Sequence, residues 1–244
     1  MVLVLVASPT GAGLSPVVDA AAQGGSVMAN VTTDVTALVQ AMHPGWNLGN
    51  ALDAIGSETS WGNPRTTRIM IEQIAALGYR SIRIPVTWGH RMAGPPAYTI
   101  DPQFMARVQE VVDWALEAGL IVVLNMHHDS GEWIIRMPHD RAGVLARFRA
   151  AWEQIAAHFR EYPHTLLFEG INEPRFSSDW NADSPLFFEL VDELQKTFHQ
   201  VVRASGGANA DRPLLLTTLT GSLSAPRVAA LARTIAGLGD DRII

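Results

Sequence analysis

Between residues 166 and 175 the chain reads Leu166-Leu167-Phe168-Glu169-Gly170-Ile171-Asn172-Glu173-Pro174-Arg175. The run is apolar at its start and polar at its end, and Pro174 cannot continue a helix. Unbroken apolar runs are typical of strands covered on both faces. We therefore interpret this stretch as a buried strand whose carboxyl end carries an amide and carboxylates.

Similar short apolar runs recur along the chain, and helical patterns separate them. The helical segments open with a capping residue and a proline, as at Asp101-Pro102 and Ser184-Pro185, and then repeat apolar residues every three or four positions. The predicted helices cover residues 101–118, 144–159, 184–205 and 224–235. The predicted strands cover residues 46–48, 81–84, 120–126, 165–171 and 214–219, and a sixth begins at 242–244.

This alternation predicts βαβ units and an α/β fold with a parallel sheet. Two architectures fit: a (β/α)8 barrel and an open doubly wound sheet. No Gly-x-Gly-x-x-Gly turn follows any strand, so dinucleotide binding has little support. We predict a (β/α)8 TIM barrel, incomplete here, with about five βα units and the start of strand six. We expect residues 41–244 to form one domain, truncated at its C-terminus, and residues 1–40 to form a leader.

Composition excludes several classes of function. The 244 residues carry a net charge of −6 and no basic stripe, which argues against a nucleic-acid partner. The chain has no cysteine, so thiol catalysis and thiolate metal sites are excluded. No stretch is long and apolar enough to cross a membrane. The apolar start, Met1 to Val6 followed by small residues, reads as a clipped signal peptide and predicts a secreted protein, with a disordered leader as the alternative.

Polar residues stand at the carboxyl ends of four predicted strands, where barrel enzymes place their functional side chains. The candidates are Asn47, Arg83, His127 and His128, and Asn172 with Glu173.

Three of these candidates suggest a specific role. A charge such as Arg83 inside an apolar strand is costly unless it is paired, so a carboxylate partner is expected. That pair is either structural or holds a catalytic carboxylate. Glu173 could donate a proton during catalysis, or cap a helix. Asn172 could donate a hydrogen bond to a sugar hydroxyl, or simply form a turn.

Three aromatic side chains complete the candidate set. His127 and His128 could bind a metal, but no His-Glu-x-x-His or separated ligand pattern lies nearby, so hydrogen bonding to substrate is the simpler role. Trp61 lies on a loop punctuated by glycine and proline and could stack on a sugar ring or pack against the protein.

Five motifs in this order resemble glycoside hydrolase family 5, in the branch that holds endoglucanases, lichenases and xyloglucanases. The resemblance covers residues 45–244. Its motifs are Gly45-Trp46-Asn47-Leu48-Gly49-Asn50, Ser60-Trp61-Gly62-Asn63-Pro64, Arg83-Ile84-Pro85-Val86-Thr87-Trp88, Leu124-Asn125-Met126-His127-His128 and Phe168 through Arg175.

The resemblance implies a retaining endo-β-1,4-glucanase that acts on β-glucan polysaccharide or oligosaccharide without metal or cofactor. Glu173 then matches the acid/base, Asn172 its neighbour, Arg83 the arginine of strand two and His127 the histidine of strand three. Asn47, Trp61 and His128 are candidate substrate-binding residues. We expect a secreted enzyme that is a monomer when full length.

The chain departs from the family pattern after strand five. The family's His-x-Tyr on strand six, its nucleophilic glutamate on strand seven and a tryptophan on strand eight have no positions here. Retaining hydrolysis needs two carboxyl groups, so we expect very low activity from this chain alone. The alternatives are a non-catalytic carbohydrate-binding protein or inactive fragment, and a metal-dependent hydrolase that uses His127 and His128.

Overall fold

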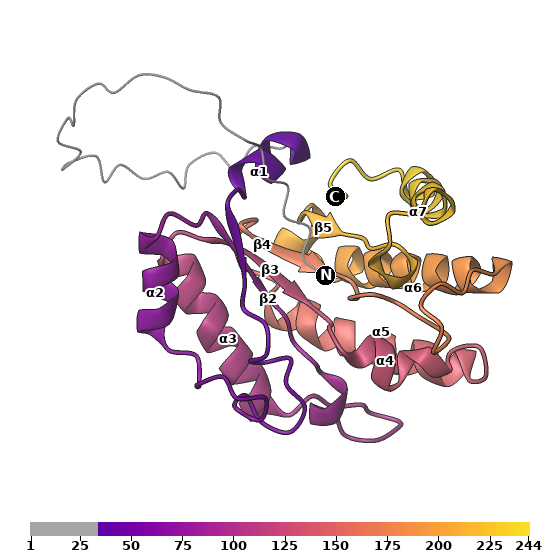
Figure 1. Ribbon diagram of the computed structural model, residues 1–244, viewed down its shortest axis with the longest axis horizontal. Helices are drawn as coiled ribbons and strands as arrows, with labels where there is room; N and C mark the ends of the chain where they lie inside the picture. Colours follow the sequence, from indigo (N-terminus) through magenta and orange to yellow (C-terminus); the bar gives the residue numbers. More distant parts are fainter. Residues whose placement is uncertain (1–33) are drawn as a thin grey trace. The chain divides into compact units, whose positions relative to one another are not determined.

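The computed structural model describes residues 34–244 and contains one parallel five-stranded sheet. The strands lie side by side in the order in which they occur in the chain, β1-β2-β3-β4-β5. A doubly wound sheet reverses its strand order at a switch point, and this sheet does not. The order therefore confirms the barrel type of winding (Figure 1). The strands are β1 (Gly45–Asn47), β2 (Ser81–Ile84), β3 (Ile121–Asn125), β4 (Leu166–Glu169) and β5 (Leu214–Leu215).

Side chains alternate between the two faces of the sheet, as strand geometry requires. Ile82, Val122 and Phe168 belong to the large core on one face. Val123 and Leu167 belong to a small cluster on the other.

Helices cover the face that holds the large core. The three longest begin at a side-chain cap: Asp101 accepts a hydrogen bond from Gln103 N, Asp140 from Gly143 N, and Ser184 from Phe187 N. Their buried residues recur at helical spacing and pack on the strands. The helices are α2 (Arg68–Ala76), α3 (Pro102–Glu117), α4 (Asp129–Glu132), α5 (Arg141–His158), α6 (Pro185–Ala204) and α7 (Ala225–Leu238), with short 3-10 turns at Gly89–Arg91, Ile134–Arg136, Gly207–Ala210 and Leu219–Gly221.

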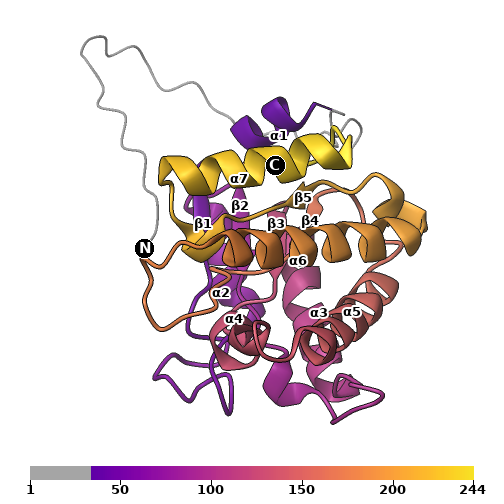
Figure 2. The ribbon, with the colours of Figure 1, turned by 90° about the vertical axis from the view of Figure 1, so that its right-hand side faces the viewer.

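One further helix, α1 (Val35–Ala41), lies across the sheet from α3 and α5 (Figure 1 and Figure 2). Its Leu38 is buried against Val123 and Leu167, so α1 belongs to the packed unit. It lies almost entirely within residues 1–40, the range predicted as a leader. The apolar start that predicts export lies outside the described residues.

Two details differ from the sequence prediction, and one is added to it. The predicted βα units imply a helix between the first two strands but give it no residue range; α2 forms there, capped by Thr67. The fifth strand ends at Leu215 instead of Leu219, because Thr217 bonds elsewhere: its carbonyl accepts from Gln195 and its hydroxyl donates to Ile171 O. The predicted sixth strand is a parallel bridge between Leu214 and Ile243. Within residues 34–244 no helix has the length and apolar character to cross a membrane.

Candidate functional site

Arg83 is the centre of the polar cluster at the carboxyl ends of the strands. Its Nε and Nη2 donate to the two carboxylate oxygens of Glu169 at 2.6 and 2.7 Å. The Glu169 side chain is 5% exposed and that of Arg83 27%. Burial alone would lower the pKa of Arg83, but the hydrogen bonds and charge of Glu169 outweigh it and raise that pKa. The structure thus confirms that Arg83 has a carboxylate partner and identifies it as Glu169.

The same guanidinium also binds both candidate asparagines. Its Nη1 donates to Asn47 Oδ1 at 3.0 Å and its Nη2 donates to Asn172 Oδ1 at 2.9 Å. Arg83 therefore draws side chains from β1, β4 and the segment after β4 into one network. Because its Oδ1 is occupied by Arg83, Asn172 keeps its amide N–H groups for other acceptors.

His127 is held in a defined tautomer by Asn125, a fully buried residue at the end of β3. Asn125 Oδ1 accepts from Val86 N at 3.2 Å, so the Asn125 amide nitrogen faces His127 Nδ1 at 3.0 Å and Glu169 Oε1 at 3.2 Å. The Nδ1 atom is thus an acceptor and the proton of the neutral ring lies on Nε2. Burial, followed by the charge of Arg83, lowers the pKa of His127 to about 3. His127 is therefore a neutral hydrogen-bond donor at ordinary pH.

His128 points to a different partner. Its Nε2 lies 3.3 Å from Asp53 Oδ2, and its ring meets Trp61 edge-on, with 5.1 Å between the ring centroids. Burial alone would raise the pKa of Asp53, but the hydrogen bonds from His128 and from the backbone N–H groups of Ala51 and Asn50 lower it overall. Trp61 keeps 42% of its surface exposed.

Asp53, His127 and His128 place ligand atoms within 4.8 Å of one another, which is the one such group in the part of the chain that the structure describes. Its hydrogen bonds do not favour a cation, however. His127 Nδ1 accepts from Asn125 and its Nε2 carries the proton, so neither nitrogen offers a free lone pair. Asp53 and His128 are already paired with each other.

Glu173 follows the polar end of β4 and has a positive φ of 43°. Non-glycine residues seldom adopt this conformation, and strain of this kind is concentrated at functional sites. The preceding residue is fixed, because Asn172 N donates to Met126 O at 2.8 Å. Asn172 Nδ2 lies 3.4 Å from Glu173 Oε2. On the other side, a Cβ placed on Gly221 would lie 3.2 Å from Cγ of Glu173. Glu173 is thus half-buried between the segments that follow β4 and β5.

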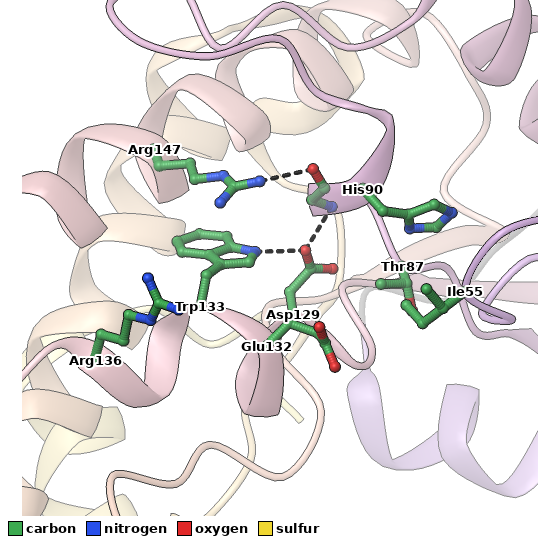
Figure 3. Close-up of a pocket in the computed structure, with 9 residues that line it drawn as sticks. Ile55, Thr87, His90, Asp129, Glu132, Trp133, Arg136 and Arg147 are labelled. Carbon is green, nitrogen blue, oxygen red and sulfur yellow. Dashed lines mark hydrogen bonds between the residues drawn. The ribbon is translucent and has the colours of Figure 1, made fainter.

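Asp129, next to the two histidines in sequence, connects the loop after β3 to the loop after β2 through hydrogen bonds. Its fully buried carboxylate accepts from Trp88 N at 2.9 Å, Gly89 N at 2.6 Å and Trp133 Nε1 at 2.7 Å. Burial raises the pKa of Asp129, and these hydrogen bonds offset part of that effect. Figure 3 shows the indole of Trp133 pointing at this carboxylate, with Arg147 along the ring. The three side chains line a cavity of about 230 Å³ that also contacts His90, Glu132 and Arg136.

The structure brings the seven predicted site residues into two linked groups. One contains Asn47, Arg83, Asn172, Glu173 and His127, and the other contains His128 and Trp61. Sequence reasoning missed Asp53, Asn125 and Glu169. The signal for the last two was a polar residue inside an apolar strand, the same signal that singled out Arg83.

Residues 47–230 match the family model described as Cellulase (glycosyl hydrolase family 5). The chain is 49% identical over 208 residues to Endoglucanase B of Paenibacillus lautus, a match that covers 84% of this chain and 37% of that protein.

Two solved structures of endo-beta-1,4-glucanases are also similar to this chain. The full-length tri-modular endo-beta-1,4-glucanase B from Bacillus halodurans has a TM-score of 0.86 and 50% identity, covering 87% of this chain and 40% of that one. A tri-modular endo-beta-1,4-glucanase from Bacillus licheniformis, complexed with cellotetraose, has a TM-score of 0.70 and 40% identity, covering 75% and 34%. The chain thus spans less than half the length of these relatives.

Proposed function

Since the chain belongs to glycosyl hydrolase family 5, we propose that the whole protein is a retaining endo-β-1,4-glucanase of which residues 41–244 form part of the catalytic domain. The observation that carries this proposal is the network around Arg83, which gathers an amide, a neutral imidazole and two glutamates at the carboxyl ends of neighbouring strands. This is the edge of the sheet where barrel enzymes carry out their chemistry.

In this proposal Glu173 is the acid/base. Its protonated carboxyl group donates the proton to the glycosidic oxygen as the bond between that oxygen and the anomeric carbon breaks. A second carboxylate attacks the anomeric carbon and forms the glycosyl-enzyme. Glu173, now a carboxylate, then removes a proton from the water that releases the sugar. The positive φ of Glu173 and its contact with Asn172 support a fixed position for this proton transfer.

The neighbouring residues would bind the sugar. Asn172 can donate its amide N–H groups to a hydroxyl, because Arg83 occupies its oxygen. His127 donates from Nε2 as a neutral imidazole at ordinary pH, because burial lowers its pKa to about 3. Asn47 is oriented by Arg83, and Trp61 and His128 offer an exposed aromatic face and an imidazole beside it.

Glu169 is not proposed as the second carboxylate. Both of its oxygens accept hydrogen bonds from Arg83, and Asn125 adds a third, so three of its roughly four lone-pair sites are taken. The side chain is also only 5% exposed, and its charge is paired with Arg83. Its role is to neutralise Arg83. We propose that the nucleophile belongs to a later strand of the whole protein, as the family resemblance implies.

The proposed substrate is a β-1,4-linked glucan. Support comes from the relatives named as endoglucanases and from the cellotetraose complex of the Bacillus licheniformis enzyme. The net charge of −6 is compatible with an uncharged polysaccharide. We also propose that the protein acts outside the cell, on the basis of the apolar residues Met1 to Val6.

The test measures the release of reducing sugar from carboxymethylcellulose by the protein expressed from its full reading frame. The Glu173→Gln variant should lose at least about a hundredfold in kcat, because general acid catalysis contributes that much, and it should still bind cellohexaose. If turnover survives in Glu173→Gln, the acid/base assignment is wrong. If neither protein turns over but both bind cellohexaose, the non-catalytic carbohydrate-binding alternative holds.

A further inference from the structure

The loop between β1 and α2 that carries Trp61 is almost entirely exposed. From residue 56 to residue 65 every residue is exposed except Glu58, which is half-buried, and the residue that follows, Thr66, is buried. A segment that buries so little apolar surface opens easily unless polar contacts hold it in place. The position of Trp61 therefore depends on the polar contacts that this loop makes.

Arg107, on α3, binds both ends of this loop. Its Nε and Nη2 donate to the two carboxylate oxygens of Glu58 at 3.0 and 2.8 Å. Its Nη2 also donates to Thr66 O at 2.6 Å, and Thr66 N donates to Glu58 Oε1 at 2.8 Å. The side chains of Arg107 and Glu58 are only 10% and 11% exposed. Arg107 thus connects residue 58 to residue 66, and Trp61 lies between them.

Arg107 is itself held by its own helix. Its guanidinium lies over the ring of Trp114, 5.1 Å from the centroid, and donates to Glu110, one turn further along α3. Burial alone would raise the pKa of Glu58, but the hydrogen bonds from Arg107 and from the Thr66 backbone lower it overall, so Glu58 is a carboxylate. A charged loop residue is therefore bound to a guanidinium whose position the helix has already fixed.

Two further contacts bring Trp61 to the candidate site. Asn63 Nδ2 donates to Gly49 O at 3.0 Å, which joins the loop to the segment after β1. The indole of Trp61 meets the ring of His128 edge-on, and 42% of Trp61 stays exposed. Packing thus leaves the indole open to a ligand, while Arg107 fixes the two ends of its loop. The orientation of Trp61 is set from α3, in the helix layer, as well as from the strand ends.

We propose that Glu58 and Arg107 are positioning residues for glucan binding: their ion pair holds residues 58–66 so that the Trp61 indole is in place before the substrate arrives. The proposal rests on the glucanase function proposed above. An ion pair this buried adds little net stability, because the desolvation of both charges offsets their attraction. Its two parallel hydrogen bonds instead impose one geometry on the loop. A loop that is ordered in advance lowers the entropic cost of binding.

The experiment measures kcat and KM for cellohexaose with the protein expressed from its full reading frame. Glu58→Ala should raise KM about fivefold and leave kcat within about twofold, because losing binding that substrate and transition state share raises KM alone. Glu58→Gln keeps one acceptor oxygen for Arg107 and should restore part of the affinity. Glu110→Ala is the matched control, since it removes a carboxylate from the same arginine and leaves both loop contacts in place. Its KM should equal that of the unmodified protein.

A double-mutant cycle shows whether Glu58 acts through Trp61. Trp61→Ala alone should raise KM about tenfold, the usual worth of one aromatic contact. Adding Glu58→Ala to Trp61→Ala should raise KM no further, because the loop then has no indole to position. If Glu58→Ala raises KM by the same factor with and without Trp61, the ion pair does not act through the indole and the proposal is wrong.

The possible results separate the two proposals. If the unmodified protein hydrolyses cellohexaose and Glu58→Ala has the same KM, the positioning role is refuted while the glucanase function stands. If the unmodified protein does not hydrolyse cellohexaose, the function proposed for the site is refuted, and the positioning role with it. Circular dichroism melting shows which variants are folded. If Glu58→Ala is not, Glu58→Gln decides: its KM should lie between those of the unmodified protein and Trp61→Ala, and an unchanged KM refutes the role.

Discussion

Arg83 and Glu169 lie on β2 and β4, which are not neighbours, yet their side chains meet through two hydrogen bonds of 2.6 and 2.7 Å. The pair crosses β3 on the face of the sheet that carries Val123 and Asn125, opposite the face covered by the large core. Because Asn47, Asn125 and Asn172 all bind one or the other member, the pair positions these three amides.

Glu169→Gln should lower the free energy of unfolding by about 3 kcal/mol, because it leaves a partly buried arginine without its counter-charge. Urea unfolding followed by circular dichroism measures the change. The control is Glu117→Gln, which removes a carboxylate from the exposed pair with Arg68, whose side chains are 56% and 48% exposed. That substitution should cost less than about 1 kcal/mol. Equal losses in the two variants would mean that the Arg83 pair has no special role.

His127 makes the stability of the protein depend on pH. Its pKa is lowered from 6.5 to about 3 in the folded chain, so the unfolded chain takes up a proton first as the pH falls. The His127 contribution therefore lowers the free energy of unfolding below about pH 6.5, by up to about 1.4 kcal/mol per pH unit, and is absent above it. His127→Gln should flatten this slope in urea titrations between about pH 7 and pH 4. The same substitution at the exposed His139 controls for the loss of an imidazole. An unchanged slope in His127→Gln would contradict the assignment.

Arg212 is fully buried, and no carboxylate pairs with it among the described residues. Instead it donates to four backbone carbonyls and to Asn209 Oδ1, and its guanidinium stacks on Phe168 at 4.9 Å. Burial, followed by the charge of Arg203, lowers its pKa to about 10. Lysine keeps the charge but cannot reproduce the five-donor fork.

Arg212→Lys should therefore cost about 3 kcal/mol in urea unfolding, because several buried carbonyls lose their donors. Arg160→Lys is the control, since that side chain is 52% exposed, and its effect should stay within about 0.5 kcal/mol. A small loss at Arg212 would show that water enters and replaces the missing donors.

Asp129→Asn should destabilise the loops after β2 and β3. The carboxylate accepts three N–H groups on two oxygens, and an amide would turn its own NH2 group toward one of these donors. We expect a loss of about 2 kcal/mol. Asp140→Asn is the matched control, because Asp140 is an exposed helix cap, where asparagine is as effective as aspartate. Equal melting temperatures for the two variants would mean that the hydrogen bonds to Asp129 do not stabilise these loops.

The sequence predicted most of the sheet because its strands are short apolar runs between well-marked helices. The bounds of β2 at Ser81 and Ile84 agree with the prediction. The end of β5 could not be predicted, because it depends on where Thr217 finds its hydrogen-bond partners, and those lie on α6 and after β4.

The sequence predicted which types of residue form the candidate site, but not which of these residues pair with each other. A charged residue in an apolar strand implied a partner for Arg83, but the partner lies 86 residues away in sequence and only the fold brings them together. Glu169 has the same strand pattern as Arg83, but the pattern alone does not indicate that these two residues pair with each other. Asp53 lies on an irregular loop, where sequence gives no sign of burial.

The Arg83–Glu169 pair also bears on how the sheet is assembled. Side chains alternate between faces, so sliding β4 by one residue would push the Glu169 carboxylate among the helices and leave Arg83 facing an apolar side chain. Both charges are neutralised in only one alignment of strands that share no hydrogen bonds of their own. The pair thus favours the native alignment of β2 and β4. A misaligned sheet would leave both charges unpaired, which is unfavourable even when no ligand is bound.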